Sequence, residues 1–380
     1  MKKNLLLLAI GLLSTSTFAQ VLYETIDSEK LGVTREIKIQ LPRNYDAEGD
    51  ILYPIIVVLD GDYLFEPVIG NADYHAYWGD MPESIVVGIN QVKSRETDLI
   101  YSDISFFPED GGAQFFEFIG MELIPYLNDN YLTSDFRIAI GHDKSANFIN
   151  YYLFKDKPLF RGYISLSPDL APEMAVRLQE RLSSIDTDTF YYVATADNDV
   201  KALREDIQVF NSQITAIENS KLHYRFDDFT DADHYSLVGL GIPKAINEIF
   251  GLFKPITKKE YKEKLLTYEE GPYAYLLKKY QDIEFFYGFE KKIVENDLRA
   301  VAAAAKKLDD IEALKDLSKL AKREYPDSMI SAYYSGLYFE REGNFKRALV
   351  QYQSGLLLQE SQFITKDMLL DKIYDLQGQN

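Results

Sequence analysis

The chain has 380 residues, of which 46% are hydrophobic and 14% aromatic. This length and composition allow one large core or two domains and exclude a disordered chain. The net charge of −19 at pH 7 repels phosphate backbones and argues against nucleic acid as a partner. The sequence contains no Cys, so the protein folds without disulfides and carries no lipid-modified cysteine.

The first 19 residues predict a secretory signal peptide. Lys2 and Lys3 form a basic start, residues 5–13 form an apolar run, and the Thr-Phe-Ala of residues 17–19 fits a small-x-small cleavage site. The apolar run is too short to span a bilayer, and no later segment is apolar enough to do so. We therefore expect an exported protein, periplasmic or extracellular, with no membrane span.

Strand-like and helix-like segments alternate over residues 20–253. The expected strands are residues 34–41, 53–59, 84–89, 136–140, 162–166, 189–195 and 222–226. Residues 53–59 form a continuous, largely β-branched run, which is typical of a strand buried on both faces. Residues 113–130 have apolar side chains at helical spacing. This alternation predicts an α/β fold with a mostly parallel central sheet and helices on both of its faces.

The pattern changes at Phe253-Lys254-Pro255, and residues 254–380 show helical periodicity only. Small and aromatic residues recur there as in a tetratricopeptide repeat. The residues in question are Ala332, Gly336, Phe339, Gly343, Asn344, Phe345, Ala348, Tyr352 and Gly355. Ala302 lies one period of about 34 residues before Gly336, and Pro326 falls at the proline position that closes the earlier repeat. A plain amphipathic helical bundle is the alternative for this second domain.

A distinctive motif follows the expected strand at residues 136–140. Gly141-His142-Asp143-Lys144-Ser145 stands where many hydrolases carry Gly-x-Ser-x-Gly on a sharp strand-to-helix turn. The nucleophile position is therefore occupied by Asp143. Ser145 and Ala146 stand where small glycines would let the turn close tightly.

Further motifs occur in a fixed order along residues 21–253. They are Leu59-Asp60-Gly61-Asp62, Gly88-Ile89 with Arg95 and Asp98, Gly111-Gly112 with Phe115-Phe116, Glu122-Leu123-Ile124-Pro125, Gly141-His142, Ser165 to Pro168, and Asp233-His234-Tyr235-Ser236. This ordered set resembles the esterase D (putative esterase) family of α/β-hydrolases. Enterochelin-type siderophore esterases, feruloyl esterases and S-formylglutathione hydrolases belong to that family.

The resemblance implies a carboxylic-ester hydrolase with a nucleophile–acid–histidine arrangement. Asp143 matches the position of the family's serine nucleophile, and His234 matches its base. The family's acid should follow the strand at residues 189–195, which leaves Asp199 or, alternatively, Asp197.

The resemblance also places the oxyanion donors. One would be the backbone N–H of Lys144, and the other would lie in the loop near Asp62. It implies a small ester or acyl ligand, no metal and no cofactor.

The aspartate changes the chemistry expected of such a site. Attack of Asp143 on an ester carbonyl would form a high-energy mixed anhydride, so ordinary serine-esterase turnover is doubtful. Two carboxylates, Asp143 and Asp199, would favour the protonated form of His234, which is not a base. We therefore expect an impaired or repurposed member, a pseudo-hydrolase that binds a ligand or a partner.

Four alternatives stay open. Asp143 could be the nucleophile of an epoxide-hydrolase or haloalkane-dehalogenase type of reaction, or a base that activates water. The first is weakened because Trp78 is the only Trp, so a paired-indole halide site cannot form. Ser145 could be a displaced nucleophile, but it lies inside the following helix. Finally, the C-terminal helices could bind a protein partner.

Overall fold

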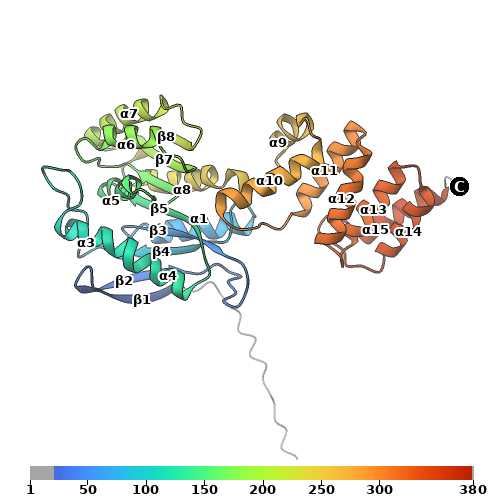
Figure 1. The fold of residues 1–380 in the computed structure, drawn as a ribbon, viewed down its shortest axis with the longest axis horizontal. Helices are drawn as coiled ribbons and strands as arrows, with labels where there is room; N and C mark the ends of the chain where they lie inside the picture. Colours follow the sequence, from blue (N-terminus) through green and yellow to red (C-terminus); the bar gives the residue numbers. More distant parts are fainter. Residues whose placement is uncertain (1–20, 379–380) are drawn as a thin grey trace, which may run out of the picture.

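The computed structural model describes residues 21–378 (Figure 1). The signal peptide expected at residues 1–19 lies outside the described residues. A sheet flanked by helices forms one end of the molecule, and a row of helices extends from it to the other end. The long helix α10 (Pro272–Tyr287) lies between these two parts.

A single eight-stranded sheet organises the first part of the chain. Its strands are β1 (Val21–Ser28), β2 (Val33–Gln40), β3 (Tyr53–Val58), β4 (Ile85–Ile89), β5 (Thr133–His142), β6 (Gly162–Leu166), β7 (Thr189–Asn198) and β8 (Leu222–Asp233). The order across the sheet is β1-β2-β4-β3-β5-β6-β7-β8. The pairs β1–β2 and β2–β4 are antiparallel, and all the others are parallel. The prediction of a mostly parallel sheet is confirmed.

The central strands are apolar at every position because both faces of the sheet are covered. In β3, Ile56 and Val58 point into one core, whereas Ile55 and Val57 point into the other. All four side chains are at most 1% exposed. Alternate residues of a strand face opposite sides, so a strand between two helical layers needs an unbroken apolar run.

Helices cover the two faces as expected for an α/β fold. One face is covered by α1 (Phe65–Tyr77) and α8 (Ser236–Ile249), and the other by α3 (Asp110–Phe118), α4 (Ile124–Asn130), α6 (Met174–Ser183) and α7 (Lys201–Thr215). The helix expected at residues 113–130 is observed, but a π-helical turn (Ile119–Leu123) separates α3 from α4. Pro125 follows this turn and lacks the N–H that a regular helix would use there.

The two edge strands differ from the expected ones. No strand was expected at β1, whose side chains are mostly half-buried or exposed. The last strand was expected to end at residue 226, whereas β8 continues along β7 to Asp233. Edge strands carry charged side chains on their open side, which hides the strand pattern. On β8, Asp228 makes two contacts with the Arg204 guanidinium, at 2.6 and 2.9 Å.

Residues beyond the sheet form helices throughout, in agreement with the predicted all-helical region. Besides α10 they are α9 (Lys258–Glu263), α11 (Glu295–Leu308), α12 (Ile311–Glu324), α13 (Met329–Arg341), α14 (Phe345–Gly355) and α15 (Lys366–Gly378). Small residues let α13 and α14 approach closely. A Cβ on Gly336 would lie 2.3 Å from the ring of Tyr352, so this position admits glycine only. No helix within residues 21–378 has both the length and the apolar character needed to cross a membrane.

The helical region shares a hydrophobic core with the sheet. Tyr287, at the end of α10, is fully buried and lies 5.1 Å from Phe136 of β5 between ring centroids. Its ring also contacts Phe250, and its hydroxyl donates to the carbonyl of Ile249 at 2.9 Å. The same cluster of buried residues continues through α11 to α15. The boundary predicted at residue 254 therefore falls within a continuous core.

Removal of the Tyr287 ring should loosen this junction. Tyr287→Ala should lower the free energy of unfolding by about 3–5 kcal/mol, because it leaves a cavity among aromatic rings and an unpaired carbonyl. Urea unfolding followed by circular dichroism measures the change. Tyr374→Ala is the matched control, since that ring is 66% exposed and its loss should change stability by at most about 0.5 kcal/mol. Equal losses in the two variants would contradict the shared core.

Candidate functional site

The turn after β5 has the geometry of a nucleophile elbow. Asp143 stands between β5 and the short helix α5 (Lys144–Phe148), with φ 59° and ψ −124°. A non-glycine residue rarely adopts a positive φ, and such strained residues concentrate at functional sites. The strain is held by hydrogen bonds on both sides. Asp143 N donates to Leu166 O at 3.0 Å, and Ala146 N donates to Asp143 O at 3.0 Å.

The elbow closes although Ser145 replaces a small glycine. A Cβ on Gly141 would lie 2.5 Å from the backbone carbonyl of Ser145, so only glycine fits before the turn. Ser145 Oγ bridges the turn, since it accepts from His142 N and donates to His142 O, both at 2.9 Å. The Ser145 side chain is fully buried. It therefore has a structural role in the elbow and no access to a substrate.

The Asp143 carboxylate is paired with an arginine. Arg95 Nη2 lies 3.3 Å from Asp143 Oδ2 and also donates to His142 O at 3.3 Å. The same guanidinium makes a fork with Asp60, at 2.7 and 3.1 Å. Asp60 is 1% exposed, so it holds Arg95 in a fixed position. Burial tends to lower the pKa of Arg95, but the hydrogen bonds and charge of Asp60 outweigh it and raise that pKa.

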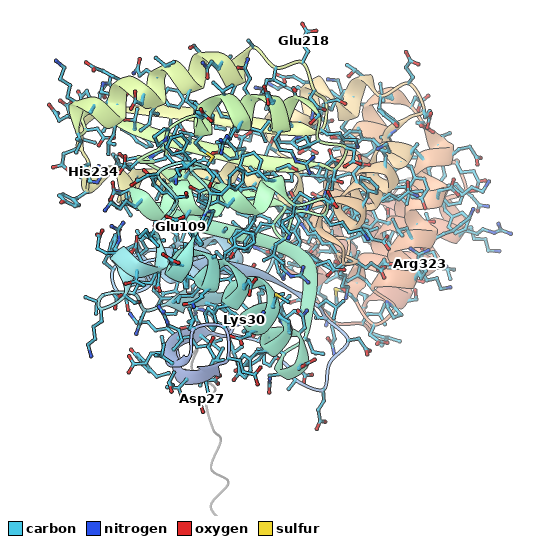
Figure 2. All side chains as sticks on the ribbon, turned by 60° about the vertical axis from the view of Figure 1, so that its left-hand side comes forward. Asp27, Lys30, Glu109, Glu218, His234 and Arg323 are labelled. Atoms are coloured by element: carbon cyan, nitrogen blue, oxygen red, sulfur yellow. The ribbon has the colours of Figure 1, made fainter. Side chains whose placement is uncertain are left out.

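His234 and Asp199 meet at the end of the sheet. Asp199 follows β7 and His234 follows the neighbouring β8, and His234 Nδ1 lies 2.8 Å from Asp199 Oδ1. Asp199 Oδ2 accepts hydrogen bonds at 2.7 Å from both Ser167 Oγ and Thr195 Oγ1. Val200 N donates to Asp199 Oδ1 at 2.8 Å. Figure 2 shows His234 at the end of the molecule opposite Arg323 of the helical region.

These contacts shift the pKa values of both partners. Burial tends to raise the pKa of Asp199, but donation from His234, Thr195, Ser167 and a backbone N–H outweighs it and lowers that pKa to about 2. The hydrogen bond to Asp199 raises the pKa of His234, burial opposes this, and the charges of Asp199 and Asp143 add to the rise. The environment therefore favours the protonated, positively charged form of His234.

The second acid candidate, Asp197, has a different role. Its carboxylate accepts from the backbone N–H groups of Asp231 at 3.0 Å and Ala232 at 3.3 Å. These contacts anchor the irregular end of β8, next to β7. Of the two carboxylates left open by the sequence, Asp199 is the one in contact with His234.

His142 lies behind the elbow, where both of its ring nitrogens have partners. Its Nε2 lies 2.9 Å from His234 O, a carbonyl that can only accept, so Nε2 carries the hydrogen. Its Nδ1 lies 3.0 Å from the Tyr63 hydroxyl, which also lies 3.3 Å from Asp60 Oδ2. Burial, followed by the charge of His234, lowers the pKa of His142. This ring positions the backbone of His234 and has no free nitrogen for catalysis.

The resemblance suggested two backbone N–H groups as oxyanion donors. The N–H groups of Lys144 and Asp62 have no hydrogen-bond acceptor within residues 21–378. The side chain of Asp62 holds its own loop in place, because its carboxylate accepts from Gln91 N at 2.6 Å and Val92 N at 2.8 Å. Unpaired N–H groups of this kind can receive a carbonyl oxygen or an anion.

The Asp143 and His234 side chains are near each other without direct bonding. Their charges interact, but no hydrogen bond joins them in the part of the chain that the structure describes. Arg95 is the hydrogen-bonding partner of the Asp143 carboxylate, and the sequence alone indicates no such role for it. Arg95 and Asp60 belonged to the ordered motifs, but only the folded chain shows that they meet Asp143. Among the described residues, no group of three or more His, Asp or Glu side chains is placed to hold a metal ion.

Comparisons with known proteins agree with this geometry. A sequence model of the family described as "Putative esterase" matches residues 28–217, which is half of the chain. The chain belongs to this esterase family. The match contains Asp143 and Asp199 and ends before His234. A comparison with curated proteins finds no match.

Solved structures extend the family likeness. An uncharacterised protein from Capnocytophaga ochracea is 32% identical, with a TM-score of 0.82, and the match covers 94% of this chain and all of that one. An IroE-like serine hydrolase from Shewanella oneidensis is 20% identical, with a TM-score of 0.61, over 79% of this chain and 98% of that one. The BES protein from Bacillus cereus is 20% identical, with a TM-score of 0.52, over 65% of this chain and 97% of that one. The last two show the fold alone.

Removal of the Asp199 charge should lower the pKa of His234. That pKa is raised in the folded protein. The Asp199–His234 contact therefore stabilises the fold fully below the ordinary His pKa of about 6.5. This stabilisation is lost as the pH rises through the raised pKa of His234. Asp199→Asn should therefore cost more stability at pH 6 than above the raised pKa of His234. NMR titration of the four histidines, with urea unfolding at both pH values, measures this.

Asp197→Asn is the matched control for this experiment. It removes the same charge two residues away but leaves the His234 contact in place. The His234 titration should then stay close to that of the unmodified protein. A shift of equal size in both variants would mean that general charge, and not the Asp199 hydrogen bond, sets the pKa of His234.

Proposed function

We propose that this protein is an esterase-family member that does not turn over esters by the serine route and instead holds a small ester or acyl ligand at its elbow. The observation that carries the proposal is the chain of contacts Asp143–Arg95–Asp60. A carboxylate paired with a fixed guanidinium is a poor nucleophile, because attack on a substrate would require it to leave its counter-ion.

The neighbouring groups support the same conclusion. In a serine esterase the histidine must be neutral in order to take the proton of the attacking hydroxyl. Here the elbow offers no hydroxyl from which His234 could take a proton, and the charge of Asp143 adds to the rise in the pKa of His234 that the Asp199 hydrogen bond already causes. The free N–H groups of Lys144 and Asp62 leave a place where a carbonyl oxygen can bind. Binding is thus retained while the covalent step is lost.

Restoration of the family's serine tests this proposal. Asp143→Ser should raise kcat/KM for p-nitrophenyl acetate by about 10²-fold or more, since Asp199 and His234 are already aligned. The natural protein should stay near the uncatalysed rate with this ester and with a siderophore ester. The double variant Asp143→Ser/His234→Ala should return to baseline, which would show that the gain uses the histidine. Clear esterase activity of the natural protein, abolished by Asp143→Ala, would refute the proposal.

An aspartate-nucleophile hydrolase is the second candidate. Asp143 favours it because its side chain is 26% exposed on a strained turn that ordinarily presents a nucleophile. Attack on a saturated carbon would give an ordinary ester on Asp143, which water could then hydrolyse. Incubation with an epoxide or a haloalkane and mass spectrometry of the Asp143 peptide decides between the candidates. A covalent adduct on Asp143 would establish this route, and its absence would leave the binding role. A base role for Asp143 toward water would show as pH-dependent turnover without an adduct.

We also infer export and a tetratricopeptide-like arrangement of residues 254–380. The basic and apolar residues of the N-terminal segment support cleavage after Ala19. The helical pairs α11–α12 and α13–α14 support the repeat, and Gly336 lets the second pair approach closely. Expression in a Gram-negative host should give a periplasmic protein whose intact mass starts at Gln20. An uncleaved chain that stays in the cytoplasm would contradict the export signal.

A further inference from the structure

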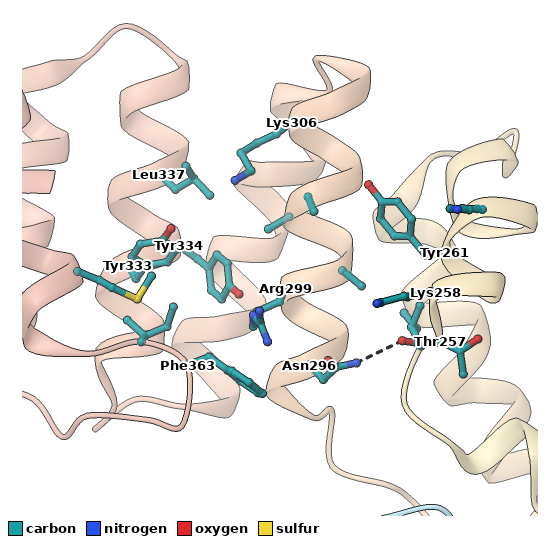
Figure 3. A pocket seen from close by; sticks show the side chains of 17 residues that line it. Thr257, Lys258, Tyr261, Asn296, Arg299, Lys306, Tyr333, Tyr334, Leu337 and Phe363 are labelled. Carbon is teal, nitrogen blue, oxygen red and sulfur yellow. Dashed lines mark hydrogen bonds between the residues drawn. The ribbon is translucent and has the colours of Figure 1, made fainter. Parts of the chain in front are cut away.

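A groove in the helical region lies far from the elbow and has no role in the proposed hydrolase-like site. It is bounded by α9, α11, α13 and the segment before α15, and its volume is about 650 Å³. We call it the basic groove and define it by Lys258, Lys262, Arg299, Lys306, Tyr334 and Phe363. Figure 3 shows these walls facing one another across an open space. A volume of this size falls within the range of about 300–1,000 Å³ that is usual for ligand-binding sites.

The groove is positively charged although the protein as a whole is acidic. Four Lys or Arg side chains line it, and no Asp or Glu does. Residues 254–380 contain 21 Lys and Arg and 21 Asp and Glu, so the net charge of −19 resides entirely in the first 253 residues. A cluster of cations without a compensating acid is therefore a local feature of this groove.

The four cations have no counter-ion in the protein. None of them forms a salt bridge or a side-chain hydrogen bond within residues 21–378. Burial lowers the pKa of Lys306, the positive charges of Lys372 and Arg341 lower it further, and the charge of Glu340 partly opposes them. Each of the four side chains therefore faces the groove without an opposite charge beside it, and an anionic ligand would supply one.

The groove also offers apolar surface and an unpaired hydroxyl. The Arg299 guanidinium lies 3.9 Å from the ring centre of Phe363, which fixes the arginine over an aromatic floor. Tyr334 is only 2% exposed, and its hydroxyl has no hydrogen-bond partner. Figure 3 shows this hydroxyl on the side of the ring toward Arg299. A buried hydroxyl without a partner costs about 1–3 kcal/mol, which a ligand acceptor could recover.

We propose that the basic groove binds a short acidic peptide segment of a partner protein. The cations come from two different helices, and Figure 3 shows Lys258, Arg299 and Lys306 spaced apart instead of converging on one point. Such spacing fits several separate carboxylates along an extended chain better than it fits a single small anion. The aromatic floor suits an apolar side chain between the acidic ones. Rows of helix pairs commonly present extended concave surfaces of this kind.

Fluorescence anisotropy of the full-length mature protein tests the proposal. The probe is a fluorescein-labelled peptide of Asp, Glu and Phe, and its counterpart has Asn and Gln in place of the acids. The acidic probe should bind saturably and more weakly as salt is added, and the neutral probe should not bind. Arg299→Glu/Lys306→Glu should weaken binding by about tenfold or more, because two attractive charges become repulsive.

Lys322→Glu/Lys346→Glu is the matched control. It makes the same change in net charge at exposed lysines of α12 and α14, outside the groove. Its affinity for the acidic peptide should stay within about twofold of the unmodified protein. Circular dichroism and thermal unfolding verify that both double variants fold.

Three outcomes would overturn the proposal. The acidic peptide could fail to bind, or both double variants could lose affinity equally, which would make the attraction one of overall charge. Alternatively, sedimentation could show that the unmodified protein self-associates and that the Arg299→Glu/Lys306→Glu variant is a monomer. The occupant would then be the acidic surface of a second copy. Tests of esterase activity at Asp143 do not affect any of these readouts.

Discussion

The central parallel strands must be covered on both faces, and most of the structure follows from this requirement. β3 and β5 lie in the middle of the sheet and have fully buried apolar side chains on either side. Exposure of either face to water would cost about 25 cal/mol for each Å² of apolar surface. Helices therefore cover both faces of the sheet. The helix α10 packs into the core on the face that α1 and α8 cover, and the row of C-terminal helices continues from it. Because neighbouring parallel strands run in the same direction, their carboxyl ends bring the elbow, Asp199 and His234 to one edge.

At that edge the protein retains the framework of an esterase but changes its electrostatics. The strained turn, the close approach at Gly141 and the Asp199–His234 contact need no serine at position 143. A carboxylate at the elbow needs a counter-ion, and Arg95 lies close enough to provide it. The same arginine is held by Asp60, so the elbow belongs to a network of fixed charges. This network explains how an acidic residue is accommodated where a neutral hydroxyl is usual.

The sequence predicted the parts of the fold that depend on local pattern. The unbroken apolar run of β3 indicated a doubly covered strand, and the repeated small residues of α13 and α14 indicated paired helices. The edge strands were the weak point. β1 was not expected, and β8 was expected to end at residue 226, because an edge strand can carry charges on its open side. Local propensity cannot distinguish such a strand from a solvated turn.

The sequence by itself determined which residues occupy the elbow, the order of Asp143, Asp199 and His234, and the presence of Asp instead of Ser at position 143. Each of these is a property of a short segment or of chain order. Only the tertiary structure decided which acid contacts His234, that Arg95 pairs with Asp143, and that four unpaired cations line one groove. These features join side chains from distant segments, and their distances are set by packing between elements. No local pattern in the chain encodes them.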